Sequence, residues 1–126
     1  MSKLKVLLID DEVELVSTLV ERLAIRGIDA EFVTTGHDAL ERMSEAVFNV
    51  VVLDLKMPGL GGLEVMQVIE EKHPGVKVII ITGHGAGSEN TEKIPEGVAS
   101  LLLKPFSIDN LVSSIHKAVE KNNGES

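Results

Sequence analysis

The sequence has no cysteine, tryptophan or tyrosine, and its only aromatic residues are three phenylalanines among 126 residues. Without cysteine, neither a disulfide framework nor a thiolate metal site can form. So few rings leave no stacking platform for nucleic-acid bases or flat cofactors. No apolar run reaches the length needed to cross a membrane. Aliphatic side chains must therefore build the core, and we expect no membrane partner.

Basic residues are also scarce, with 12 lysines and arginines against 20 acidic residues and a formal net charge of −8. This imbalance argues against direct binding of nucleic acid or of an anionic membrane. The opening residues MSKLKVLLID do not resemble a signal peptide, because their apolar stretch is short and runs into acids. We expect a cytoplasmic protein with one domain over residues 1–121 and a polar tail or linker start over 122–126.

Short apolar segments predict five β-strands. Three of them are continuous runs, Val6–Ile9, Val50–Leu53 and Val76–Ile81, as expected for parallel strands that are covered on both faces. The segment Ile28–Val33 alternates apolar and acidic residues, which indicates a strand at the sheet edge. Leu101–Leu103 supplies the fifth strand.

Helical spacing of apolar residues predicts a helix in most of the connections. Such spacing spans residues 16–23, 40–43, 65–69 and 108–119, with Thr35 and Ser107 at the start of two of these helices. The window 85–98 contains few apolar residues and Pro95, which in a helix interior costs about 3 kcal/mol, so we expect a weak fourth helix. Alternating strands and helices predict an α/β fold, a doubly wound parallel sheet with helices on both faces.

Polar residues directly follow four of these predicted strands: Asp10, Asp11 and Glu12; Asp54; Thr82; and Lys104. In open parallel sheets, binding residues lie beyond the carboxyl ends of the strands, so these side chains should share one edge. Clustered carboxylates repel one another unless a cation joins them, and oxygen ligands favour a hard ion such as Mg²⁺. A lysine and a hydroxyl could then bind phosphoryl oxygens.

Each of these residues also has an ordinary structural explanation. Acids such as Asp11 and Glu12 are common in the first turn of a helix, where the dipole favours them. Asp54 and Thr82 are residue types that often form turns. The functional interpretation depends on the coincidence that four separate strands place compatible groups at the same edge.

Four segments, IDDE, VVLDLKMPGLGG, IITGHG and LLLKPF, in this order and spacing resemble the receiver domains of response regulators in two-component signal transduction. The resemblance covers nearly the whole chain. It implies a flavodoxin-like five-stranded sheet with strand order 2-1-3-4-5. It also implies that residues 1–121 are the receiver domain.

The resemblance assigns roles residue by residue. Asp54 would be the phosphoacceptor, and Mg²⁺ would be held by Asp10, Asp11, Asp54 and the backbone carbonyl of Lys56. Thr82 and Lys104 would contact the phosphoryl oxygens. The Lys104–Pro105 bond is often cis in this family, as X-Pro bonds can be.

The resemblance further implies phosphotransfer from a sensor histidine kinase, a phosphotransfer protein or a small acyl phosphate onto Asp54. Water would later hydrolyse the acyl phosphate, so the protein would catalyse its own modification without being a turnover enzyme. An effector domain, a downstream protein or a second copy of the chain would receive the signal.

Two departures from the family leave an alternative open. Leu101 stands where the family usually has a switch aromatic, and Pro95 weakens the predicted fourth helix. The alternative is a receiver-fold interaction module that no longer switches by phosphorylation. A dehalogenase-type phosphatase would want an acid where Lys56 stands, and the acids after the first strand would repel a flavin phosphate.

Overall fold

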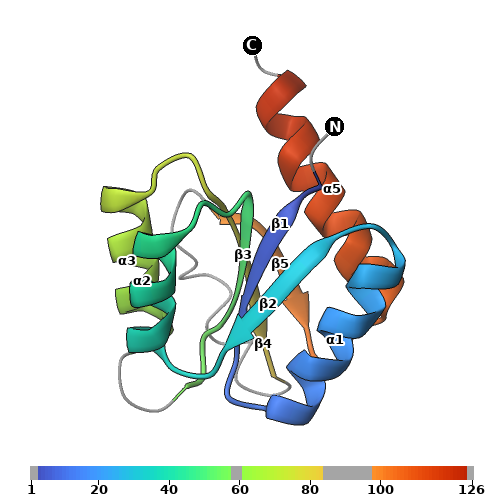
Figure 1. Ribbon diagram of the computed structural model, residues 1–126, viewed down its shortest axis with the longest axis horizontal. Coiled ribbons are helices and arrows are strands. Elements are labelled where there is room, and N and C mark those ends of the chain that lie inside the picture. The colour runs from blue at the N-terminus through green and yellow to red at the C-terminus, as the bar shows by residue number, and fades with distance from the viewer. Residues whose placement is uncertain (1–2, 58–60, 84–97, 125–126) are drawn as a thin grey trace.

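The computed structural model describes residues 3–57, 61–83 and 98–124. They form one parallel sheet with the order β2-β1-β3-β4-β5, which confirms the predicted flavodoxin-like fold (Figure 1). The strands are β1 (Lys5–Ile9), β2 (Asp29–Val33), β3 (Val50–Asp54), β4 (Lys77–Thr82) and β5 (Val98–Leu103). The helices are α1 (Val13–Ile25), α2 (Gly36–Glu45), α3 (Gly62–Lys72) and α5 (Ile108–Gly124).

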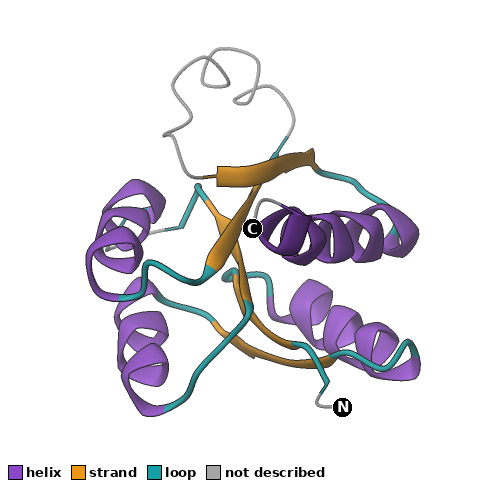
Figure 2. Cartoon of the chain, turned by 90° about the horizontal axis from the view of Figure 1, so that it is seen from above, coloured by secondary structure: helices purple, strands orange, loops and turns teal. Residues whose placement is uncertain are grey.

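Alternate side chains of the central strands enter two separate cores. In β1, Leu7 and Ile9 belong to the core under α2 and α3, whereas Val6 and Leu8 belong to the core under α1 and α5. Figure 2 shows the two helix pairs on opposite faces of the sheet. Because both faces are covered, β3 is buried over its full length, which explains why its sequence is apolar without alternation.

The alternating segment lies at the sheet edge as predicted, because β2 pairs with β1 alone. Ala30 and Phe32 pack against the core under α1 and α5. Glu31 points to the opposite face and accepts two hydrogen bonds from Arg42 of α2, at 2.6 Å and 3.1 Å. The bidentate pair fixes α2 over the edge strand.

Two predicted helix starts are confirmed by side-chain caps. Thr35 Oγ1 accepts a hydrogen bond from the Asp38 backbone N–H at 3.0 Å, and Ser107 Oγ accepts one from Asn110 at the same distance. At the other end of the chain, α5 continues to Gly124 and so extends past the predicted boundary at residue 121. Of the described helices, none has the length and apolar character that a bilayer crossing requires.

Pro95 and the window 85–98 of the predicted fourth helix lie outside the described residues, except for Val98 at the end of the window. The following strand differs from its prediction: β5 begins at Val98, three positions before Leu101. Its first residues, Val98, Ala99 and Ser100, are only partly buried and too small or polar to give an apolar run. The extended conformation of these three residues comes from their pairing with β4, which a local sequence pattern does not reveal.

Gly62 is the first residue of α3 and lies against the end of β3. A Cβ atom built there would come within 2.8 Å of the Leu55 Cα atom and 3.1 Å of the Asp54 carbonyl oxygen. Both neighbours are backbone atoms, so they cannot move aside as a flexible side chain would. The absence of a side chain at Gly62 therefore lets α3 start directly beside Asp54.

We expect Gly62→Ala to lower the free energy of unfolding by about 1–3 kcal/mol, because the methyl group forces backbone atoms apart. Urea denaturation followed by far-UV circular dichroism measures the change. Gly75→Ala is the matched control, since a Cβ at Gly75 meets nothing within 4 Å. Equal stability of the two variants would contradict the close-packing argument.

Candidate functional site

The end of β1 places one acid inside the molecule and two outside it. Asp10 is fully buried, and its backbone N–H donates to the carbonyl of Val33 at 3.2 Å. Its Oδ1 atom accepts a hydrogen bond from the Glu12 N–H at 2.9 Å, which turns the chain into α1. Asp11, between them, is exposed. The turn thus fixes the Asp10 carboxylate at the carboxyl edge of the sheet.

Asp54 is the last residue of β3 and is only 4% exposed. Its Oδ1 atom accepts a hydrogen bond from the backbone N–H of Lys56 at 2.9 Å. The Leu55 N–H donates to the Ile81 carbonyl at 3.2 Å and so ties the residues after β3 to β4. These contacts orient the carboxylate and leave its Oδ2 atom turned toward Lys104, 3.4 Å from Nζ.

Thr82 and Lys104 come from the neighbouring strand ends. Thr82 is buried at the end of β4, and its carbonyl accepts a hydrogen bond from the Lys104 N–H at 2.8 Å. The Lys104–Pro105 bond is cis, the form that is frequent in the family that the sequence resembles. Lys104 extends over the acids: its Nζ lies 2.9 Å from Asp10 Oδ2 and also pairs with Glu12 and Asp54.

Burial and charge act in opposite directions at this cluster. Burial raises the pKa of Asp10, although the Glu12 N–H and the Lys104 ammonium act to lower it. Burial alone would lower the pKa of Lys104, but its contacts with Glu12 and Asp10 outweigh this and raise the pKa above its ordinary value. Lys104 therefore remains a cation. Its single positive charge does not fully offset the cost of burying the Asp10 carboxylate, whose pKa stays raised.

The carboxylates brought together differ in one member from those proposed on the sequence. Oxygens of Asp10, Glu12 and Asp54 lie within 4.8 Å of one another, and among the described residues this is the group suited to a metal ion. Asp11 is not in the group. Glu12 follows the same strand, but an acid at the start of a helix is common because the helix dipole favours it. The contact of Glu12 with Lys104 could not be predicted from the sequence, because no local pattern indicates it.

The donor set fits a hard divalent cation. All of its atoms are carboxylate oxygens, which suit Mg²⁺ better than soft metals. Among the described residues, the buried Asp10 Oδ2 atom has no hydrogen-bond partner, although the Lys104 ammonium lies 2.9 Å away. A buried charged oxygen without a hydrogen bond is costly, so an additional cation at this position would stabilise it.

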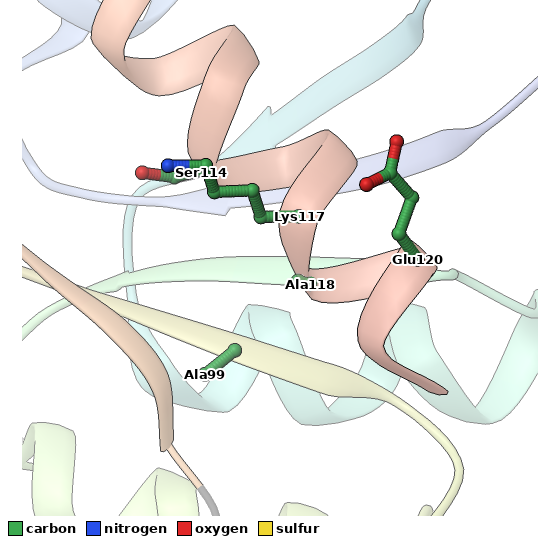
Figure 3. Close-up of a pocket in the computed structure, with 5 residues that line it drawn as sticks. All are labelled: Ala99, Ser114, Lys117, Ala118 and Glu120. Atoms are coloured by element: carbon green, nitrogen blue, oxygen red, sulfur yellow. The ribbon is translucent and has the colours of Figure 1, made fainter. Parts of the chain in front are cut away.

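A hollow of about 470 Å³ lies elsewhere, between α5 and β5 (Figure 3). Ala99 points from β5 toward α5, and the side chains of Lys117 and Glu120 extend outward from α5. Its described lining contains one carboxylate and no cluster of acids, so its chemistry differs from that of the strand ends. The acidic cluster is therefore the candidate site.

Comparison with known proteins agrees with this geometry. The family model of the response regulator receiver domain matches residues 6–116. The chain is 29% identical to the luminescence regulatory protein LuxO of Vibrio campbellii, over 90% of this chain and 25% of that protein. It is 32% identical to the C4-dicarboxylate transport transcriptional regulatory protein DctD of Rhizobium meliloti, over 92% of this chain and 25% of that protein.

A solved structure shows the same arrangement of elements. The response regulator receiver domain protein from Clostridium thermocellum superimposes with a TM-score of 0.87 at 29% identity, covering 98% of this chain and 99% of that one. The chain spans about a quarter of the length of the two curated relatives. The similarity therefore concerns one domain of those longer proteins.

The crowding of carboxylates predicts that Asp54→Asn stabilises the metal-free protein. Losing one of three neighbouring negative charges relieves the repulsion at Asp10, and we expect a gain of roughly 1 kcal/mol in unfolding free energy. Urea denaturation in the presence of a chelator measures it. Asp29→Asn, an exposed acid at the start of β2, should change little. A destabilised Asp54→Asn protein would mean that Lys104 already neutralises the cluster.

Proposed function

The chain belongs to the response regulator receiver domain family, and on this premise we propose that Asp54 accepts a phosphoryl group in a Mg²⁺-dependent reaction. The phosphodonor would be a sensor histidine kinase, a phosphotransfer protein or a small acyl phosphate. The observation that carries the proposal is the single Lys104 ammonium held beside both Asp54 and Asp10 at the carboxyl edge of the sheet. Such a cation can stabilise the negative charge on the oxygens of a phosphoryl group that is transferred to Asp54.

The transfer would be an in-line displacement at phosphorus. An oxygen of the Asp54 carboxylate forms the new O–P bond while the bond from phosphorus to the donor nitrogen or oxygen breaks. The leaving imidazole or carboxylate keeps the electron pair. The Lys56 N–H, bonded to Asp54 Oδ1, holds the carboxylate in one orientation for the attack.

Asp10, Asp11, Asp54 and the backbone carbonyl of Lys56 would hold Mg²⁺. Glu12 lies in the same group of carboxylates, but its carboxylate is paired with Lys104, so we assign the remaining ligand position to Asp11. The bound ion would neutralise negative charge on the phosphoryl oxygens. Lys104 and Thr82 would contact those oxygens from the β4–β5 side, through the ammonium and the hydroxyl. Hydrolysis would end the signal: water attacks phosphorus, the O–P bond to Asp54 breaks, and inorganic phosphate leaves.

We assign the domain a signalling role in the cytoplasm, over residues 1–121. Phosphorylation would shift it between two conformations, and an effector domain, a downstream protein or a second copy would respond. The modification is stoichiometric, so the domain would not be a turnover enzyme. No direct nucleic-acid contact is proposed for this acidic domain.

Leu101 favours a second candidate, an interaction module that does not switch by phosphorylation. Its side chain packs against the core under α2 and α3, at the position where the family usually has a mobile ring. Such a module could still accept a phosphoryl group on Asp54. It would differ in showing no conformational response to that group.

We expect acetyl phosphate and Mg²⁺ to add one phosphoryl group to the protein and Asp54→Asn to abolish the addition, because an amide is a far poorer nucleophile than a carboxylate. Intact-mass spectrometry detects the added group. Asp29→Asn keeps Asp54 and should be labelled like the wild type. Full labelling of the Asp54→Asn protein would show that the phosphoacceptor lies elsewhere.

Lys104→Ala should weaken the response to beryllofluoride, a phosphoryl mimic, by roughly tenfold or more in ligand concentration, because a charge-assisted contact is lost. Amide NMR shifts report the response, which is needed because the protein has no tryptophan or tyrosine. Lys72→Ala removes an exposed lysine from the last turn of α3 and serves as the control.

The same NMR titration of the wild type distinguishes the two candidate functions. If the wild type binds beryllofluoride with shifts confined to the site, the interaction module is the better description.

A further inference from the structure

Glu12 has a contact that the assigned roles do not explain. Its side chain is 58% exposed, yet it pairs with Lys104, a residue 92 positions away in sequence. Its backbone is fixed, because its N–H donates to Asp10 Oδ1 at 2.9 Å. An exposed acid would ordinarily be free to sample many rotamers. Here its backbone is anchored to the buried acid and its carboxylate meets the lysine.

The three partners of Lys104 lie at different depths. Asp10 and Asp54 are buried below the ammonium, and Glu12 lies at the solvent side. The lysine side chain itself is only 19% exposed. An ammonium has three donors on a flexible four-carbon stem, so three surrounding carboxylates restrict it to one small region.

Phosphorylation would change only some of these contacts. A phosphoryl group on Asp54 would turn the carboxylate that pairs with Lys104 into an acyl phosphate. A divalent cation would compete with Lys104 for Asp10. Glu12 is the partner that neither event occupies under the proposed assignment. Glu12 can therefore hold the Lys104 ammonium at the mouth of the site before and during phosphoryl transfer. The lysine side chain then does not lose time or free energy in other rotamers.

We propose that Glu12 is a positioning residue for phosphotransfer: its carboxylate holds Lys104 Nζ beside Asp54 until the phosphoryl group arrives. Glu12 acts through Lys104 and touches neither the phosphoryl group nor the metal ion. The inference rests on the proposed function. It separates Glu12 from the neighbouring acid Asp11, which is not among the carboxylates that pair with Lys104 in the described part of the chain.

The test is a double-mutant cycle on the phosphorylation rate, with acetyl phosphate as donor, saturating Mg²⁺ and intact mass as the readout. Glu12→Gln should slow the reaction roughly two- to fivefold, the range expected for a half-exposed ion pair. The deficit should disappear in a Lys104→Met background. Glu12→Asp keeps the charge on a shorter side chain and should restore part of the rate.

Glu14→Gln is the matched control, because Glu14 is an exposed acid in the first turn of the same helix and the Lys104 ammonium pairs with Glu12, Asp10 and Asp54 instead. An equal loss of rate in that variant would attribute the effect to net charge and overturn the proposal. So would a Glu12→Gln deficit that disappears as Mg²⁺ is raised, since this is the behaviour of a metal ligand.

The remaining outcomes also decide the question. If Lys104→Met is too slow for the cycle, a Glu12→Gln deficit that persists at saturating Mg²⁺ and recovers in Glu12→Asp supports positioning. A Glu12→Gln protein as fast as the wild type overturns the inference and leaves the proposed function intact. A wild-type protein that takes no phosphoryl group instead contradicts the proposed function itself.

Discussion

The ammonium of Lys104 lies among three carboxylates at the carboxyl edge of the sheet, and this arrangement controls the chemistry of the site. Parallel pairing in the order β2-β1-β3-β4-β5 brings the ends of β1 and β3 side by side, so Asp10 and Asp54 cannot separate. Their repulsion has to be balanced by positive charge. One lysine supplies only part of it, which leaves the cluster suited to a divalent ion.

The apolar layers make that arrangement rigid. β3 is buried throughout, and the side chains of β1 and β4 enter both cores, so no strand can slide without exposing aliphatic surface. Gly62, the first residue of α3, allows this helix to approach the backbone of Asp54. Close packing thereby holds the carboxylates of Asp10 and Asp54 near each other, although their repulsion favours separation.

Much of this was predictable from sequence, because buried parallel strands give continuous apolar runs and Val50–Leu53 is one of them. The start of β5 was not, since Val98–Ser100 depend on pairing with β4. Asp10, Asp54, Thr82 and Lys104 could be placed at one edge by their positions after strands. The partnership of Glu12 with Lys104 could not, because side-chain direction depends on tertiary contacts across 92 residues.

Lys104 also links the acidic cluster to the strand pair on its other side. Its N–H donates to the Thr82 carbonyl, while its side chain reaches the carboxylates, so one residue joins the backbone of β4 to the charge on Asp54. Under the proposed function, a change of charge at Asp54 would act on the lysine side chain first, and the backbone of Thr82 is one hydrogen bond away. Leu101 is a partly buried aliphatic residue packed against the core, and this connection needs no rotating ring. Glu12 pairs with the ammonium on the solvent side, and in the positioning role proposed for it this contact would limit how far the ammonium can move.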